Sequence, residues 1–213
     1  HSFPTRRSSD LQRTYSDKPW DPVTQLAAAY GYGFFATLIN LATAYATITN
    51  DGVRLEPRIV KRIRRPEGTV EEVGRPEGVE VISVNAASSA REALRHVVMD
   101  DGGTGDQARP TLYTAGGKTG TARVAKTDEA DKAWNCSFIG FAPAEDPRVV
   151  IAITIIRPQV HFGGGSAAGP VFAEVVDKAL PIMGVEPIFK PKQPATEKQA
   201  STRNEGEASD VPN

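Results

Sequence analysis

The chain has 213 residues, of which 39% are hydrophobic and 24% charged, a composition typical of a globular domain with its own core. Its formal net charge of −1 gives no indication of electrostatic binding to nucleic acid or to an anionic membrane. Cys136 is the only cysteine and the three histidines have no ligand spacing, so we expect no disulfide, no metal and no other cofactor. No apolar run approaches the roughly 20 residues of a transmembrane helix.

The two ends of the chain differ from its middle. Residues 1–11 lack an initiator methionine, and DNA encoding them in frame resembles a sequencing adapter. We therefore expect this stretch to be an artefact of sequence assembly, with the natural protein continuing upstream of Gln12. Residues 188–213 are polar and aperiodic, and we expect them to be a disordered tail. The interpretable domain is residues 12–187.

The first predicted element is a helix over residues 36–50, where apolar side chains recur every three or four residues. Thr37 is placed to cap its start, and Gly52 follows its end. Residues 53–84 are charged and rich in β-forming residues. Their turn signals are Pro66-Glu67-Gly68 and Pro76-Glu77-Gly78.

A second helix is predicted between a capping box at residues 89–92 and a stop at residues 101–103. Its expected buried residues are Ala90, Leu94, Val97 and Val98. Three strands then follow, over residues 118–126, 135–142 and 148–157. A proline-bounded turn at residues 143–147 makes the last two an antiparallel hairpin.

The last predicted element is a helix with Pro170 at its first position and one apolar face. That face consists of Phe172, Val175, Val176, Ala179 and Leu180. Helices on both sides of sequential strands indicate a mixed α/β (α+β) fold, in which an antiparallel sheet is flanked by helices.

The segment Gly117-Lys118-Thr119-Gly120-Thr121 has two chemical interpretations. A phosphate-binding P-loop requires a glycine five residues before Gly117, where Leu112 stands, and a helix where a strand is predicted. Nucleotide binding is therefore disfavoured. The other interpretation is the Lys-Thr-Gly element that opens an active-site strand in β-lactamases and penicillin-binding proteins.

Each residue of this element suits acyl transfer to or from a peptide. The Thr121 N–H would stabilise an oxyanion, and Gly120 would let a substrate approach the strand. The hydroxyls of Thr119 and Thr121 would bind a terminal carboxylate, and Lys118 would add positive charge beside the nucleophile. The predicted catalytic residues are Lys118 and Thr121, and the predicted substrate-binding residues are Thr119, Gly120 and Thr121.

Segments around the motif resemble class B penicillin-binding proteins, the D,D-transpeptidases of peptidoglycan synthesis. In the family's order they are Gly31-Tyr32-Gly33, residues 37–46, Asn50-Asp51-Gly52, residues 116–122, residues 138–143 and residues 168–172. Leu38 stands where the family usually has proline. The stretches 163–165 and 183–187 are more similar to the division-type branch, penicillin-binding protein 3.

The resemblance implies a five-stranded antiparallel sheet flanked by helices, incomplete in this chain. It implies stem peptides ending in D-Ala-D-Ala as substrates, β-lactams as ligands, and a glycosyltransferase and divisome membrane proteins as partners. It also implies a bacterial inner-membrane protein with a periplasmic or extracytoplasmic catalytic domain, used in septal cell-wall synthesis.

The family's nucleophile motif, Ser-x-x-Lys, occurs nowhere in the 213 residues. Ser83-Val84-Asn85 matches the family's Ser-x-Asn, but it follows the Gly-Tyr-Gly segment instead of preceding it, and we expect it to start a helix. Packing is the expected role of Tyr113 and Trp134. We expect the chain alone not to react with penicillin. A serine β-lactamase or D,D-carboxypeptidase of the same fold, and a non-catalytic divisome interaction domain, remain alternatives.

Overall fold

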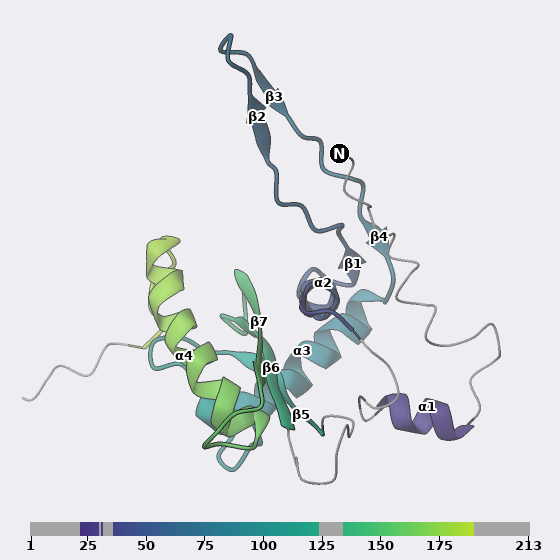
Figure 1. The fold of residues 1–213 in the computed structure, drawn as a ribbon, viewed down its shortest axis with the longest axis vertical. Helices are drawn as coiled ribbons and strands as arrows, with labels where there is room; N and C mark the ends of the chain where they lie inside the picture. The colour runs from purple at the N-terminus through teal and green to yellow at the C-terminus, as the bar shows by residue number, and fades with distance from the viewer. Residues whose placement is uncertain (1–21, 30, 32–35, 124–133, 190–213) are drawn as a thin grey trace, which may run out of the picture.

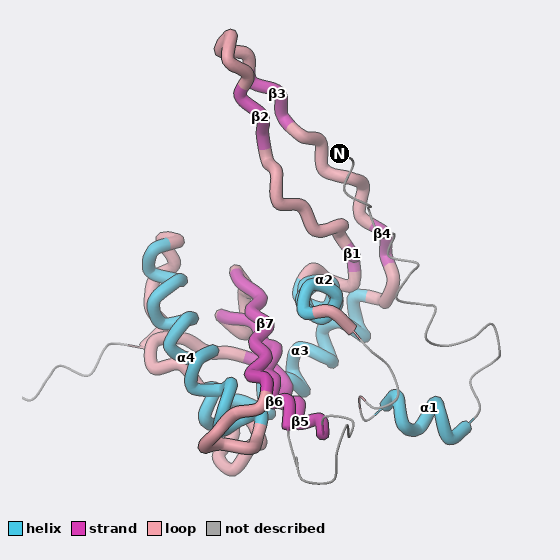
Figure 2. Tube along the Cα trace, viewed as in Figure 1, coloured by secondary structure: helices cyan, strands magenta, loops and turns pink. Residues whose placement is uncertain are grey.

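The computed structural model describes residues 22–29, 31, 36–123 and 134–189, and it is a mixed α/β structure (Figures 1 and 2). Its helices are α1 (Pro22–Ala29), α2 (Leu38–Thr49), α3 (Val84–Met99) and α4 (Gly164–Ile182), with a 3₁₀ turn at Asp106–Ala108. Its strands are β1 (Val53–Arg54), β2 (Arg62–Arg64), β3 (Val70–Glu72), β4 (Val79–Glu80), β5 (Gly116–Arg123), β6 (Trp134–Ala142) and β7 (Val149–Ile156). None of the helices described is long and apolar enough to cross a lipid bilayer.

The main sheet is antiparallel, in the order β5-β6-β7. Helix α4 covers one face, and α2 and α3 lie on the other (Figure 1). The predicted fold class and the predicted β6–β7 hairpin are therefore confirmed. Within the described residues the sheet has three of the five strands that the family resemblance implies.

The core lies between the sheet and α4. Phe138 of β6 and Phe172 of α4 are fully buried, and their ring centroids are 4.8 Å apart with the planes inclined at 53°. Val176 and Leu180 continue the buried face of α4. Val175 was expected on this face, but it is 39% exposed, because it lies one residue to the side of the buried stripe.

Helix α2 closely follows its prediction. The side chain of Thr37 accepts a hydrogen bond of 3.3 Å from the Asn40 N–H and so caps the helix. After the helix, Asp51 and Gly52 take positive φ values of 52° and 88°. The chain reverses there, as the sequence indicated.

Two predicted helix starts are wrong. Helix α3 begins at Val84, where Ser83 accepts a hydrogen bond of 3.3 Å from the Ala86 N–H. The box at residues 89–92 therefore lies inside the helix, whereas the expectation that Ser83-Val84-Asn85 starts a helix is confirmed. Helix α4 begins at Gly164 and contains Pro170. The small residues before Pro170 extend this helix along the sheet, and a proline there forfeits one backbone hydrogen bond without ending it.

Residues 53–82 form a long two-stranded arm that extends away from the main sheet (Figure 1). The predicted turn at its tip is confirmed, since Gly68 has a φ of 92° and its N–H bonds the carbonyl of Arg65. The second predicted turn, at residues 76–78, is wrong, because this segment runs without a turn into β4. Gly78 lies against Val53, which accounts for the glycine there.

The segment after α4 returns to the entry of β5. The amides of Ile188 and Phe189 both donate to the carbonyl of Leu112, at 2.9 and 3.0 Å. The Asp177 carboxylate of α4 binds the Thr111 and Leu112 amides from the other side, at 2.8 and 3.0 Å. The expected artefact at residues 1–11 and the rest of the expected tail, residues 190–213, lie outside the described residues.

Candidate active site

The Lys-Thr-Gly-Thr motif lies on β5, which begins two residues before the predicted start and pairs with β6. Its other edge, which we call the free edge, has no strand partner among the described residues. The strand continues through the motif to Arg123, and residues 124–126 of the prediction lie outside the described part. A strand after Lys118 excludes the P-loop interpretation, which requires a helix there.

The register of the sheet decides which peptide groups face the free edge. Arg157 donates a hydrogen bond of 2.9 Å to the carbonyl of Trp134, so alternate residues of β6, counted from Trp134, bond to β7. The intervening residues, including Ser137, bond to β5, and Ser137 pairs with Gly120. The N–H and carbonyl of Thr121 therefore point outward. This is the orientation that an oxyanion donor needs.

The side chains of the motif divide between the two faces of β5, because successive strand residues point to opposite sides. Thr119 and Thr121 lie on the α4 side, where the Thr121 Oγ1 accepts a hydrogen bond of 3.0 Å from the Gly164 N–H. Lys118 points to the other side and is exposed. Its Nζ turns back over the strand, 3.2 Å from the Thr119 carbonyl oxygen and 3.4 Å from the Thr119 hydroxyl.

A cation, two hydroxyl groups and an outward N–H thus lie within four consecutive residues. Lys118 and Thr121 are exposed and Thr119 is half-buried. All of these groups favour an anionic ligand, either a carboxylate or a developing oxyanion. The four predicted site residues are therefore adjacent and accessible, although their roles remain predictions.

At two positions of this strand, close packing against β6 leaves room only for glycine. A Cβ on Gly120 would collide with the hydroxyl of Ser137, its cross-strand partner. A Cβ on Gly117 would lie 2.6 Å from the ring of Phe138 and 2.7 Å from the carbonyl of Ile139. Packing against β6 thus requires these glycines, in addition to any approach by a substrate.

The residues to which the sequence assigned no catalytic or substrate-binding role have structural roles. Ser83 caps α3, and Ser166 donates a hydrogen bond of 3.2 Å to the carbonyl of Gly163. Tyr113 is buried and donates a hydrogen bond of 2.8 Å to the carbonyl of Val185, which confirms its packing role. Burial, together with Asp177 and Glu186, raises the pKa of its phenol. Trp134 is half-buried at the start of β6.

Cys136 lies opposite Thr121 on β6 and is fully buried. Burial raises the pKa of its thiol, so less of the reactive thiolate is present at a given pH. We expect iodoacetamide to modify the native chain more than about tenfold more slowly than the urea-unfolded chain at the same pH. Mass spectrometry of timed samples measures both rates, and equal rates would contradict the buried position.

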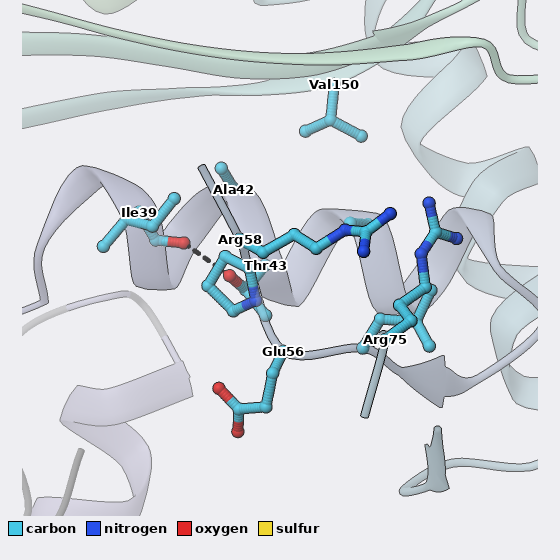
Figure 3. A pocket seen from close by; sticks show the side chains of 10 residues that line it. Ile39, Ala42, Thr43, Glu56, Arg58, Arg75 and Val150 are labelled. Carbon is cyan, nitrogen blue, oxygen red and sulfur yellow. Dashed lines mark hydrogen bonds between the residues drawn. The ribbon is translucent and has the colours of Figure 1, made fainter. Parts of the chain in front are cut away.

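A pocket of about 340 Å³ lies away from the motif, between α2, the base of the arm and β7 (Figure 3). Its lining residues are Ile39, Ala42, Thr43, Ala46, Leu55, Glu56, Pro57, Arg58, Arg75 and Val150. Arg58 is held at the rim by a hydrogen bond of 2.6 Å to the carbonyl of Val73. No predicted site residue lines this pocket. In the part of the chain that the structure describes, His, Cys, Asp and Glu side chains form no group able to hold a metal ion.

Comparisons with known proteins agree with the motif. The model of the penicillin binding protein transpeptidase domain matches residues 3–177. Penicillin-binding protein PbpB of Mycolicibacterium smegmatis is 42% identical over 160 residues, which cover 70% of this chain and 25% of that protein. The probable peptidoglycan D,D-transpeptidase PenA of Neisseria flavescens is 36% identical over 203 residues, covering 94% of this chain and 48% of that protein.

Solved structures show the same relationship. Penicillin-binding protein 3 of Mycobacterium tuberculosis, complexed with aztreonam, matches with a TM-score of 0.71 and 32% identity, over 79% of this chain and 40% of that chain. The transpeptidase domain of Burkholderia pseudomallei penicillin-binding protein 3 has a TM-score of 0.66 and 33% identity, over 80% and 50%. The chain thus spans at most half the length of these four proteins. The family model covers most of the chain, including strand β5, and the relatives are class B proteins, so the chain belongs to the penicillin-binding protein transpeptidase family, among its class B members.

Proposed function

We propose that this chain supplies the substrate-carboxylate wall of a peptidoglycan D,D-transpeptidase. The observation that carries the proposal is the outward Thr121 N–H on the free edge of β5, next to two hydroxyls and the Lys118 ammonium. These groups match the two anionic centres of the reaction, the terminal carboxylate of a D-Ala-D-Ala stem peptide and the oxyanion of its tetrahedral intermediate.

The reaction proceeds through an acyl-serine intermediate. A serine hydroxyl adds to the penultimate D-Ala carbonyl and passes its proton to a base. The base gives that proton to the leaving nitrogen as the C–N bond breaks and the terminal D-Ala departs. An amine of a second stem peptide takes the acyl group and frees the serine. In this chain Thr121 would hold the oxyanion through its N–H, and Thr119 and Thr121 would hold the carboxylate through their hydroxyls. Lys118 would stabilise the negative charge of both the carboxylate and the oxyanion.

The proposed context follows from the relatives. A penicillin would occupy the same wall through its own carboxylate, and one neighbouring structure is a complex with ampicillin. Several relatives are named penicillin-binding protein 3 or stage V sporulation protein D, which supports a division-type role in septal synthesis. A glycosyltransferase and divisome membrane proteins would be its partners, at the outer side of the bacterial inner membrane.

The proposal is tested with a fluorescent penicillin. The 213-residue chain alone should not be labelled, because it contains no Ser-x-x-Lys. We expect the rest of the Neisseria flavescens relative to supply the family's Ser-x-x-Lys, so a hybrid in which this chain replaces the matched segment of that protein should be labelled covalently. Gel fluorescence after denaturation measures both results. Labelling of the chain alone, or a folded hybrid that is never labelled, would refute the proposal.

A further inference from the structure

The Thr121 hydroxyl is tied to the first turn of α4. Helix α4 has 19 residues, and its N-cap residue, Gly163, offers no side-chain hydrogen bond. The Thr121 Oγ1 takes that place by accepting the Gly164 N–H at 3.0 Å. One of the amides left without a partner at a helix start is therefore satisfied by a residue of the candidate active site.

This contact is possible only with glycine at position 164. A Cβ built there would lie 2.5 Å from the carbonyl oxygen and 2.8 Å from the nitrogen of Gly120, and would also collide with the carbonyl of Ser137. These are backbone atoms of β5 and β6, which cannot move aside as a side chain can. By contrast, a Cβ on Gly163 would meet only the Ser166 hydroxyl, at 3.0 Å.

The contact also determines what the Thr121 hydroxyl can do. A hydroxyl has one hydrogen to donate and two lone pairs that accept. With one lone pair filled by the Gly164 N–H, the O–H hydrogen must point away from α4. Accepting a hydrogen bond also strengthens the hydroxyl as a donor, and the positive end of a helix favours an anion nearby.

We infer that Gly164 is a positioning residue for substrate recognition, because its N–H orients the Thr121 hydroxyl to donate to the substrate's terminal carboxylate. This inference rests on the proposed function and deepens it. It predicts that Gly164 affects the preference for a carboxylate over a neutral group at the end of the substrate. A merely structural role would change overall affinity without changing that preference.

The probes are N-acetyl-D-alanyl-D-alanine and its C-terminal amide, titrated into the 213-residue chain and followed by the amide NMR signals of β5. The wild-type chain should bind the carboxylate form more tightly. Gly164→Ala should reduce this preference about tenfold, which corresponds to one lost hydrogen bond to a charged group. Gly163→Ala, the matched control in the same loop, should keep it.

Two further variants keep the test decisive if Gly164→Ala disturbs folding. Thr121→Val removes the hydroxyl with little change in volume and should lose the preference, whereas Thr121→Ser should restore it. The Gly164 amide should also exchange with solvent faster in Thr121→Val than in Thr121→Ser.

The two proposals fail in different ways. A wild-type preference that survives in Gly164→Ala, or an unchanged Gly164 exchange rate in Thr121→Val, would overturn the positioning role and leave the proposed function standing. A wild-type chain that binds neither probe, or both equally, would overturn the carboxylate site and the inference with it.

Discussion

Replacing Phe172 with alanine is expected to lower the free energy of unfolding by about 3–5 kcal/mol. The ring is fully buried and packs at 4.8 Å, inclined at 53°, against Phe138 of the central strand. Removing it leaves a cavity between α4 and the sheet and also removes an aromatic pair worth about 0.5–1.5 kcal/mol.

Urea denaturation followed by circular dichroism measures the loss. The matched control is Val171→Ala, one residue earlier on the same helix, where the side chain is 42% exposed. That variant should change stability by less than about 0.5 kcal/mol. Similar losses for both variants would mean that α4 does not bury the face assigned to it.

The features that the sequence predicted well are those determined within a few residues. Helix α2 carries its own cap, since Thr37 bonds an amide three residues away, and its end is marked by Asp51 and Gly52. The β6–β7 hairpin likewise combines two apolar strands with a short proline-bounded turn. Local chemistry and the final structure agree in these places.

Two wrong predictions, the start of α4 and the turn at residues 76–78, concern features that depend on distant contacts. The cap of α4 is Thr121, which is 43 residues away along the chain, so no local pattern could locate the start at Gly164. The preference of proline for the first position of a helix predicts a start at Pro170, and the packing of residues 164–169 overrides that preference. Similarly, the sequence predicts a turn at Gly78, whereas the structure needs glycine there because the arm brings Val53 against it.

The candidate site combines features that are determined locally with features that depend on distant contacts. The sequence predicted its four residues from the motif, and the structure adds the reason for their orientation, which is the hydrogen-bond register with β6. That register depends on the pairing of Gly120 with Ser137 and on the pairing of β6 with β7. A sequence pattern can predict a strand, but it cannot determine which edge its peptide groups face until its partner strand is known.

Replacing Lys118 with alanine in the hybrid with the Neisseria flavescens relative is expected to slow acylation by penicillin about 100-fold. Oriented charges and donors beside a developing oxyanion contribute about this much when one of them is removed. The Lys118 Nζ, held 3.2 Å from the outward carbonyl of Thr119, lies beside the outward Thr121 N–H. Its charge therefore acts where the negative charge of the intermediate forms.

Stopped-flow measurement of the second-order acylation rate tests this expectation, and Lys178→Ala is the matched control. Lys178 is also a lysine, but it lies on the exposed side of α4, paired with Glu174. Its replacement should leave the rate unchanged, because a surface ion pair contributes little to stability and lies away from β5. If both variants acylated at the rate of the unmodified hybrid, Lys118 would be only a solvent-facing residue of the strand. If Lys118→Ala alone is slow, the free edge of β5 is the side from which the substrate is bound.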